Sequence, residues 1–241
     1  MINPVAELRE FLRAALVEPV GQPAAEPAHL VRRRRWIAGA TLLLGAGTLA
    51  WAVRIPPGDP LFYPATLGLA ALWMLGALLS GPLHLGRGHT RSGLRQSRSV
   101  VQSLALGLLL LGAFLAGAVL VAGVPVLRDP VQLLLDHARY GSLPLVAALT
   151  AINGIAEELY FRGALFAALP HRRAVLVTTL VYGLATVPTN IPLLVFAAVV
   201  LGLVVGLQRR VTGGVLGPIV THLTWSLGML FLLPYTLDVW M

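Results

Sequence analysis

Two adjacent glutamates and an arginine interrupt an apolar stretch, residues 143–169, that is long enough to cross a membrane. Glu157, Glu158 and Arg162 fall within six residues of one another. A charge near the centre of a bilayer costs about 2.5–3.5 kcal/mol even on lenient insertion scales, so such residues mark a functional site by default. A carboxylate at this depth could act as a general base and take a proton from water.

Helical spacing separates the two glutamates. Glu158 and Arg162 are four residues apart, so they share a helix face and can form an ion pair. Glu157 lies about 100° further round the helix, and Asn153, one turn earlier, shares its face. The spacing predicts a structural pair, Glu158 with Arg162, and a free Glu157 that points into a cavity. The alternative is that the charges only tie helices together.

His222 is the other strongly polar group at a comparable depth. At about 1.5 Å per residue from the nearest flanking arginines, Glu157, Thr186 and His222 lie roughly 22, 20 and 18 Å deep. Helix bundles build sites from side chains that share such a layer. Ser226 lies one turn after His222 and shares its face. A packing role for His222 is the alternative interpretation.

An imidazole beside a water-activating glutamate has two possible uses. It could steady the oxyanion that forms when water attacks an amide. It could also bind a metal, so a divalent ion such as zinc, held by Glu157 and His222, is one option and no metal is the other. One glutamate and one histidine are too few for a closed zinc site, which uses three or four protein ligands.

The composition places these residues in an integral membrane protein. The chain is 57% hydrophobic and 12% charged, whereas an ordinary soluble domain is roughly 25% charged. All 18 basic residues are arginine, and they cluster at the ends of apolar runs, which indicates membrane topology rather than a nucleic-acid partner. The sequence has no cysteine, which excludes disulfides and thiolate chemistry.

Seven apolar runs predict an all-α, polytopic membrane helix bundle of about seven transmembrane helices, within a range of six to eight. The runs are 36–53, 61–80, 99–124, 143–169, 174–187, 191–207 and 213–233. Residues 186–192 break the pattern, either as part of a site or as an ordinary turn between helices. Gly202 and Gly206 form a weak signal for helix packing.

Three segments follow from this division. Residues 1–35 hold an amphipathic helix at 4–18 that we expect on the membrane surface, then a linker and an arginine run. Residues 36–127 hold the first transmembrane helices, and residues 128–241 the core. A short external helix should precede that core, with Asp129 as its cap, Pro130 at its first position and Gly141 at its end.

The arginines also predict an orientation. If the runs alternate in direction, 14 of the 18 arginines fall on one side, which places the N-terminus in the cytoplasm and the C-terminus outside. The 14 are Arg9, Arg13, Arg32, Arg33, Arg34, Arg35, Arg87, Arg91, Arg95, Arg98, Arg172, Arg173, Arg209 and Arg210.

Three short motifs resemble those of a known family. The segment 157–163, EELYFRG, resembles the EExxxR motif of the CPBP family (CAAX prenyl protease 2 and bacteriocin-processing proteins, also called Abi), which are intramembrane endopeptidases. The segment 182–190 resembles the second motif, FxxxH followed by a Pro-Asn turn, and 222–226 the third, HxxxN or HxxxD. Order and spacing agree over roughly residues 143–230.

The resemblance implies roles for these positions. Glu157 would be the general base, His222 the oxyanion-side or metal-side histidine, and Glu158 with Arg162 would organise the helix. The chain departs from the family pattern because Thr186 stands where the family has histidine, and Ser226 where it has asparagine or aspartate. Loss of an assisting acid or base could cost ~10²–10⁴ in rate, so a weakened or inactive protein is expected.

The leading interpretation is an intramembrane endopeptidase of the bacterial inner membrane that cleaves a peptide or membrane-protein substrate with a glutamate-activated water. The first alternative is an inactive scaffold or a bacteriocin self-immunity protein of the same family. The second is a proton-coupled transporter with Glu157 and His222 as a relay, against which stands the lack of an inverted repeat.

Overall fold

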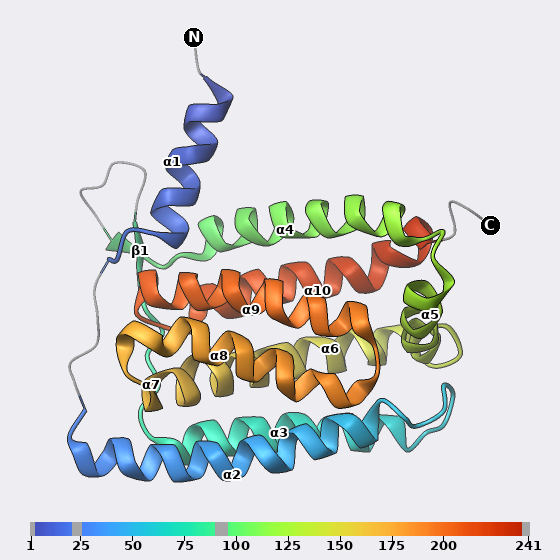
Figure 1. Ribbon diagram of the computed structural model, residues 1–241, viewed down its shortest axis with the longest axis horizontal. Helices are drawn as coiled ribbons and strands as arrows, with labels where there is room; N and C mark the ends of the chain where they lie inside the picture. Colours follow the sequence, from blue (N-terminus) through green and yellow to red (C-terminus); the bar gives the residue numbers. More distant parts are fainter. Residues whose placement is uncertain (1–2, 21–25, 90–95, 238–241) are drawn as a thin grey trace.

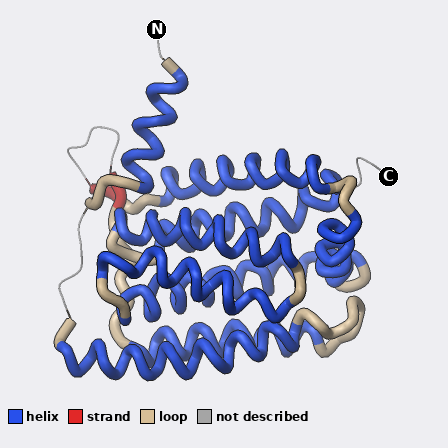
Figure 2. The backbone as a smooth tube through the Cα atoms, in the orientation of Figure 1, coloured by secondary structure: helices blue, strands red, loops and turns tan. Residues whose placement is uncertain are grey.

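The computed structural model describes residues 3–20, 26–89 and 96–237 of the chain. Within these residues the fold is helical apart from one pair of two-residue strands, β1 (Gly88–His89) and β2 (Gln96–Ser97), which run antiparallel (Figure 2). The all-α prediction is therefore confirmed. The long helices lie side by side along the longest dimension of the molecule (Figure 1).

Each of the seven apolar runs forms helix. Between Leu143 and Ala168 three consecutive helical segments follow one another without a loop. The helices are α2 (Ala28–Ala52), α3 (Phe62–Ser80), α4 (Val100–Val121), α6 (Leu143–Glu158) with the π-helix η1 (Leu159–Leu165) and α7 (Phe166–Ala168), α8 (His171–Thr186), α9 (Pro192–Thr212) and α10 (Leu216–Leu237).

Four of these helices, α3, α4, α9 and α10, are long and apolar enough to cross a membrane by themselves. A fifth span is counted if α5 (Pro125–Arg139) and the helix Leu143–Ala168, which are bent by 115°, are taken as one. Helix α8 has only 16 residues, and α2 carries four arginines near its start. The chain is a multi-pass membrane protein, while the count of about seven spans stays a prediction.

The arginine-bearing helix ends meet at one end of the bundle, on the left in Figure 1. The start of α2, the start of α8 and the last turn of α9 lie there, and arginines of α2 and α9 donate hydrogen bonds to neighbouring segments. For example, Arg35 Nε donates to the carbonyl oxygen of Ala168 at 2.9 Å. The predicted clustering thus holds for these elements, while Arg91 and Arg95 lie outside the described residues. Which end faces the cytoplasm stays a prediction.

Helix α1 (Pro4–Leu16) confirms that the amphipathic segment is helical. Asn3 caps it, because its side-chain oxygen accepts from the backbone N–H groups of Val5 and Ala6 at 3.1 and 3.3 Å. The helix leaves the arginine-bearing end and runs across the direction of the long helices (Figure 1). One side of α1 and residues Leu207 and Arg210 of α9 line an open surface hollow of about 580 Å³. Its placement on a membrane surface stays a prediction.

The predicted start of α5 was wrong. The helix begins at Pro125 with Val124 as its cap, so Pro130 lies inside it, and Asp129 is bonded to Arg128 rather than to the helix start. Pro125 explains the shift, since its fixed φ suits the first turn of a helix and competes with the later Asp-Pro signal. The helix ends at Arg139, two residues before Gly141.

The break at residues 186–192 is a turn between α8 and α9. It contains the 3₁₀ helix η2 (Val187–Thr189), followed by Asn190 in the left-handed region at φ 60°. Arg54, which follows the end of α2, donates from Nη2 to the carbonyl oxygen of Pro188 at 3.0 Å. Of the two interpretations of this break, the structure matches the ordinary turn.

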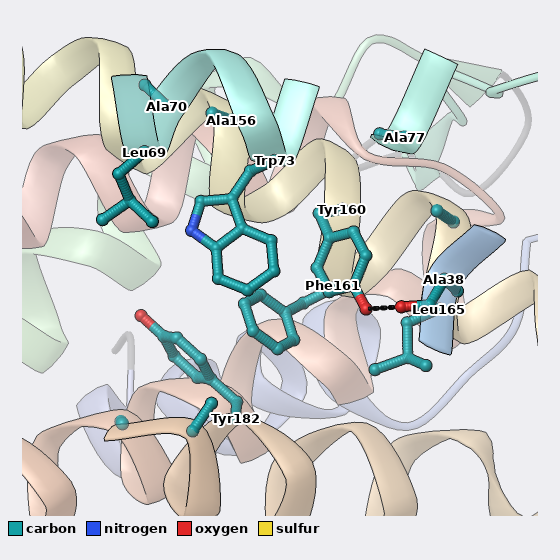
Figure 3. Close-up of a cluster of buried hydrophobic side chains, with 13 residues drawn as sticks. Ala38, Leu69, Ala70, Trp73, Ala77, Ala156, Tyr160, Phe161, Leu165 and Tyr182 are labelled. Atoms are coloured by element: carbon teal, nitrogen blue, oxygen red, sulfur yellow. Dashed lines mark hydrogen bonds between the residues drawn. The ribbon is translucent and has the colours of Figure 1, made fainter. Parts of the chain in front are cut away.

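An aromatic cluster packs α3 against η1 and α8 (Figure 3). The ring centroids of Trp73 and Tyr160 are 4.5 Å apart, those of Trp73 and Phe161 are 5.2 Å apart, and those of Phe161 and Tyr182 are 4.6 Å apart. The Tyr160 hydroxyl donates to the carbonyl oxygen of Ala38 at 2.5 Å. This packing holds the helix that carries the glutamates in place from one side.

Candidate active site

Glu158 is fully buried and joins two helices. Its Oε1 accepts a hydrogen bond from Arg162 Nη1 at 3.0 Å and another from His222 Nδ1 at 2.8 Å. The predicted pair of Glu158 and Arg162 is therefore present. The contact with His222 was not predicted, since the depth argument paired that histidine with Glu157. An ionised carboxylate only accepts hydrogen bonds, so Nδ1 carries the hydrogen and Nε2 is the atom left for other contacts.

Arg162 lies in the π-helix that follows the glutamates directly. Its guanidinium group sits over the ring of Tyr182 at 4.8 Å and over that of Phe161 at 5.7 Å, in the geometry of cation–π contacts. Its Nε and Nη2 are buried without a hydrogen-bond partner among the described residues. The ring faces are therefore its main contact besides Glu158. Short π-helical segments inside α-helices occur frequently at functional sites.

Glu157 points to a different helix from Glu158, as the spacing predicted. It is partly exposed, and its Oε2 accepts a hydrogen bond from the hydroxyl of Tyr182 on α8 at 2.5 Å. The carboxylate is thus not wholly free, because one of its two oxygens has a partner. Its neighbours His222 and Arg162 are close enough to act on its charge.

Tyr182 is the site residue that sequence analysis missed. It packs on Phe161 and on Gly202 of α9, where an added Cβ would lie 3.3 Å from Tyr182 Cδ1. The available signal was that Tyr182 stands one turn before Thr186 and therefore shares its helix face. Gly206, where a Cβ would lie 3.4 Å from a methyl group of Val175 on α8, confirms the packing role expected for the glycine pair.

Thr186 is buried, and its hydroxyl donates to the carbonyl oxygen of Tyr182 at 2.8 Å, within its own helix. The Ser226 hydroxyl oxygen is also buried and has no hydrogen-bond partner in the described part of the chain. The structure therefore places both residues in the interior but does not connect their hydroxyl groups to either glutamate.

Asn153 ties the glutamate helix to α3. Its Nδ2 donates to the carbonyl oxygens of Thr66, at 3.3 Å, and Leu149, at 3.0 Å. Its Oδ1 is buried and finds no partner within the residues that the structure describes. Asn153 is one turn from Glu157, and its hydrogen bond to Thr66 positions the helix that carries the glutamates.

The donor set does not fit a closed metal site. Over residues 3–20, 26–89 and 96–237, no group of three or more His, Cys, Asp or Glu side chains could hold a metal ion. Glu157 and His222 alone supply two donors, fewer than the three or four of a zinc site.

Residues 139–228 are the part of the chain that is similar to a known protein family. Residues 139–228 match the family model described as Type II CAAX prenyl endopeptidase Rce1-like. No curated protein and no solved structure matches the chain. The matched segment includes both glutamates, Arg162, Tyr182 and His222 and runs from the end of α5 into α10. The match supports the resemblance to the CPBP family, and over residues 139–228 the chain is similar to Rce1-like membrane endopeptidases.

Proposed function

We propose that the chain is an intramembrane endopeptidase in which Glu157 activates a water molecule. The observation that carries this proposal is the difference between the two adjacent carboxylates. Glu158 is fully buried and accepts hydrogen bonds from Arg162 and His222. Glu157 is partly exposed, and among the described residues its hydrogen bond is the one from Tyr182 to a single oxygen, Oε2. Glu157 is the carboxylate that a water molecule can reach.

The reaction proceeds in two steps. Water held at Glu157 Oε1 attacks the carbonyl carbon of the scissile peptide bond, and its proton passes to Glu157 while the carbonyl oxygen becomes an oxyanion. When both of its ring nitrogens are protonated, His222 can donate from Nε2 to that oxyanion. The C–N bond then breaks as Glu157 gives its proton to the leaving nitrogen, which yields a free carboxyl group and a free amine.

Glu158 acts through its neighbours in this scheme. Its bond to Nδ1 sets the orientation of the His222 ring, and its bond to Arg162 neutralises its own charge in the interior. The substrate is a peptide or a membrane protein. The setting we propose is the bacterial inner membrane, with the N-terminus in the cytoplasm and the C-terminus outside.

The experiment compares membrane-protein fragments from cells that produce wild type, Glu157→Gln and His222→Ala at equal levels. Glutamine keeps the size of the glutamate side chain but cannot take a proton from water. We expect fragments with wild type that disappear with Glu157→Gln, although the variant remains in the membrane. Identical fragment sets from all three proteins would count against a peptidase.

A scaffold without activity is the second candidate. It is favoured by the positions of the two departures from the family pattern, because the Thr186 hydroxyl is bonded within its own helix and the Ser226 hydroxyl has no described partner. A scaffold, or a self-immunity protein of this kind, would keep its function in Glu157→Gln. For the proton-coupled transporter we have no comparable supporting observation.

A further inference from the structure

We propose that Tyr182 is a positioning residue for Glu157 and takes the place of the histidine that the second motif lacks at Thr186. This inference rests on the proposed function, since it concerns how the general base of that reaction is held. It assigns a role to a hydroxyl group that the motif pattern, with phenylalanine at this position, does not contain.

The direct observation is the hydrogen bond from the Tyr182 hydroxyl to Glu157 Oε2 at 2.5 Å. The motif has phenylalanine followed four residues later by histidine, whereas the chain has Tyr182 followed four residues later by Thr186. Residues four apart lie on the same face of a helix. The polar group that reaches the glutamate has therefore moved by one turn along the same face of α8.

Thr186 does not supply this contact itself. Its side chain is buried, and its hydroxyl hydrogen is directed at the carbonyl oxygen of Tyr182, 2.8 Å away. A threonine hydroxyl carries a single hydrogen, so this bond uses its only donor. The position that corresponds to the motif histidine thus supports the backbone of the tyrosine rather than the carboxylate.

The neighbours of Tyr182 fix its ring. The Arg162 guanidinium carbon lies 4.8 Å from the ring centroid, and the Phe161 ring centroid lies 4.6 Å away. On a third side Gly202 leaves room for the ring, because even a Cβ there would come within 3.3 Å of Cδ1. A residue locked by packing can hold its partner in one orientation, which is what a catalytic carboxylate requires.

The consequence concerns the two oxygens of Glu157. Tyr182 donates to Oε2, which leaves Oε1 to hold and deprotonate the water. A neutral phenol donates one hydrogen bond, so this role is to orient the base and not to replace it. Arg162 is linked to both carboxylates, through a hydrogen bond to Glu158 and through the ring of Tyr182 to Glu157.

The first test needs no substrate. Infrared difference spectra between wild type and Glu157→Gln, each purified in full length and placed in liposomes, should isolate the carboxylate stretching band of Glu157. Tyr182→Phe should shift this band, because the carboxyl group loses a hydrogen-bond donor. The matched control, Thr186→Val, removes a hydroxyl that bonds elsewhere and should leave the band in place. A band that does not move in Tyr182→Phe would overturn the inference.

The second test uses the fragments of the proposed peptidase. Loss of a hydrogen bond to a charged group is expected to lower the rate about 10-fold or more in Tyr182→Phe. The double variant Tyr182→Phe/Thr186→His restores the motif pattern and should recover fragments relative to Tyr182→Phe alone. If wild type gives no Glu157-dependent fragments, the peptidase proposal fails, while a band shift still shows that Tyr182 orients the carboxyl group. If fragments depend on Glu157 but not on Tyr182, the positioning role is wrong.

Discussion

His222 on α10 donates from Nδ1 to Glu158 Oε1 on α6 at 2.8 Å, while the neighbouring Glu157 is bonded to Tyr182 on α8. Two residues adjacent in sequence thus reach two different helices, because each step along a helix turns the side chain by about 100°. This divergence joins the segments that carry the three motifs. It also distinguishes the buried carboxylate of Glu158, which accepts two hydrogen bonds, from the partly exposed carboxylate of Glu157.

The ion pair of Glu158 and Arg162 predicts a large effect on stability. Arg162→Met removes the positive partner of a fully buried carboxylate, and breaking one side of a buried pair typically costs about 3–5 kcal/mol. Thermal unfolding of the purified protein in detergent should show this as a clearly lower midpoint.

A matched control is the exposed pair of Arg13 and Glu18, whose side chains are 68% and 46% exposed. Exposed pairs contribute about 0–1 kcal/mol because solvent screens them, so Arg13→Met should hardly change the midpoint. Equal shifts in the two variants would mean that the buried pair contributes no more to stability than the exposed one.

Much of the fold follows from the sequence because apolar length and helical spacing are local properties. The seven apolar runs are all helical, and the i,i+4 spacing of Glu158 and Arg162 is enough to predict their contact even though Arg162 lies in a π-helix. The clustering of arginines at one end follows in the same way from alternating helix directions.

The contacts between helices could not be predicted in the same way. A depth count places His222 near the glutamates, but which glutamate it contacts depends on the rotation of α10 relative to α6, which a count of residues does not contain. Tyr182 was missed because an aromatic residue in an apolar helix is usually a packing residue. Its hydroxyl group becomes a candidate site group because α6 places the Glu157 carboxylate within hydrogen-bond distance of it.

Substitution of alanine for two glycines of α2, Gly45 and Gly47, should change the stability of the protein in different directions. A Cβ on Gly45 would overlap the indole ring of Trp73, whereas a Cβ on Gly47 meets nothing within 4 Å. Gly45→Ala should displace Trp73 from the aromatic cluster and destabilise the protein by about 1–3 kcal/mol. Gly47→Ala should be neutral or up to about 1 kcal/mol stabilising, since alanine favours helix over glycine. Unfolding midpoints that change alike would show that the close approach of α2 to Trp73 does not matter for stability.

If α1 lies on the membrane surface, spin labels at Leu8 and Glu10 should meet different environments, lipid at Leu8 and water at Glu10. Leu8 lines the open surface hollow together with Leu207, whereas Glu10 lies about 200° round the helix from Leu8. If α1 lies on the membrane, a nitroxide attached at Leu8→Cys in liposomes should be relaxed by oxygen from the lipid phase. One attached at Glu10→Cys should be relaxed by a water-soluble nickel complex instead. Equal exposure of both labels to the nickel complex would place α1 away from the bilayer.

The orientation of the bundle can be tested with the same strategy, since the sequence contains no cysteine. Ser97 is exposed beside β1 at the arginine-bearing end, and Ser142 is exposed between α5 and α6 at the other end. Arginine-rich loops stay preferentially in the cytoplasm. A membrane-impermeant maleimide added to intact cells, or to spheroplasts where an outer membrane is present, should therefore label Ser142→Cys, and should label Ser97→Cys only after the membrane is permeabilised. The reverse pattern would invert the orientation.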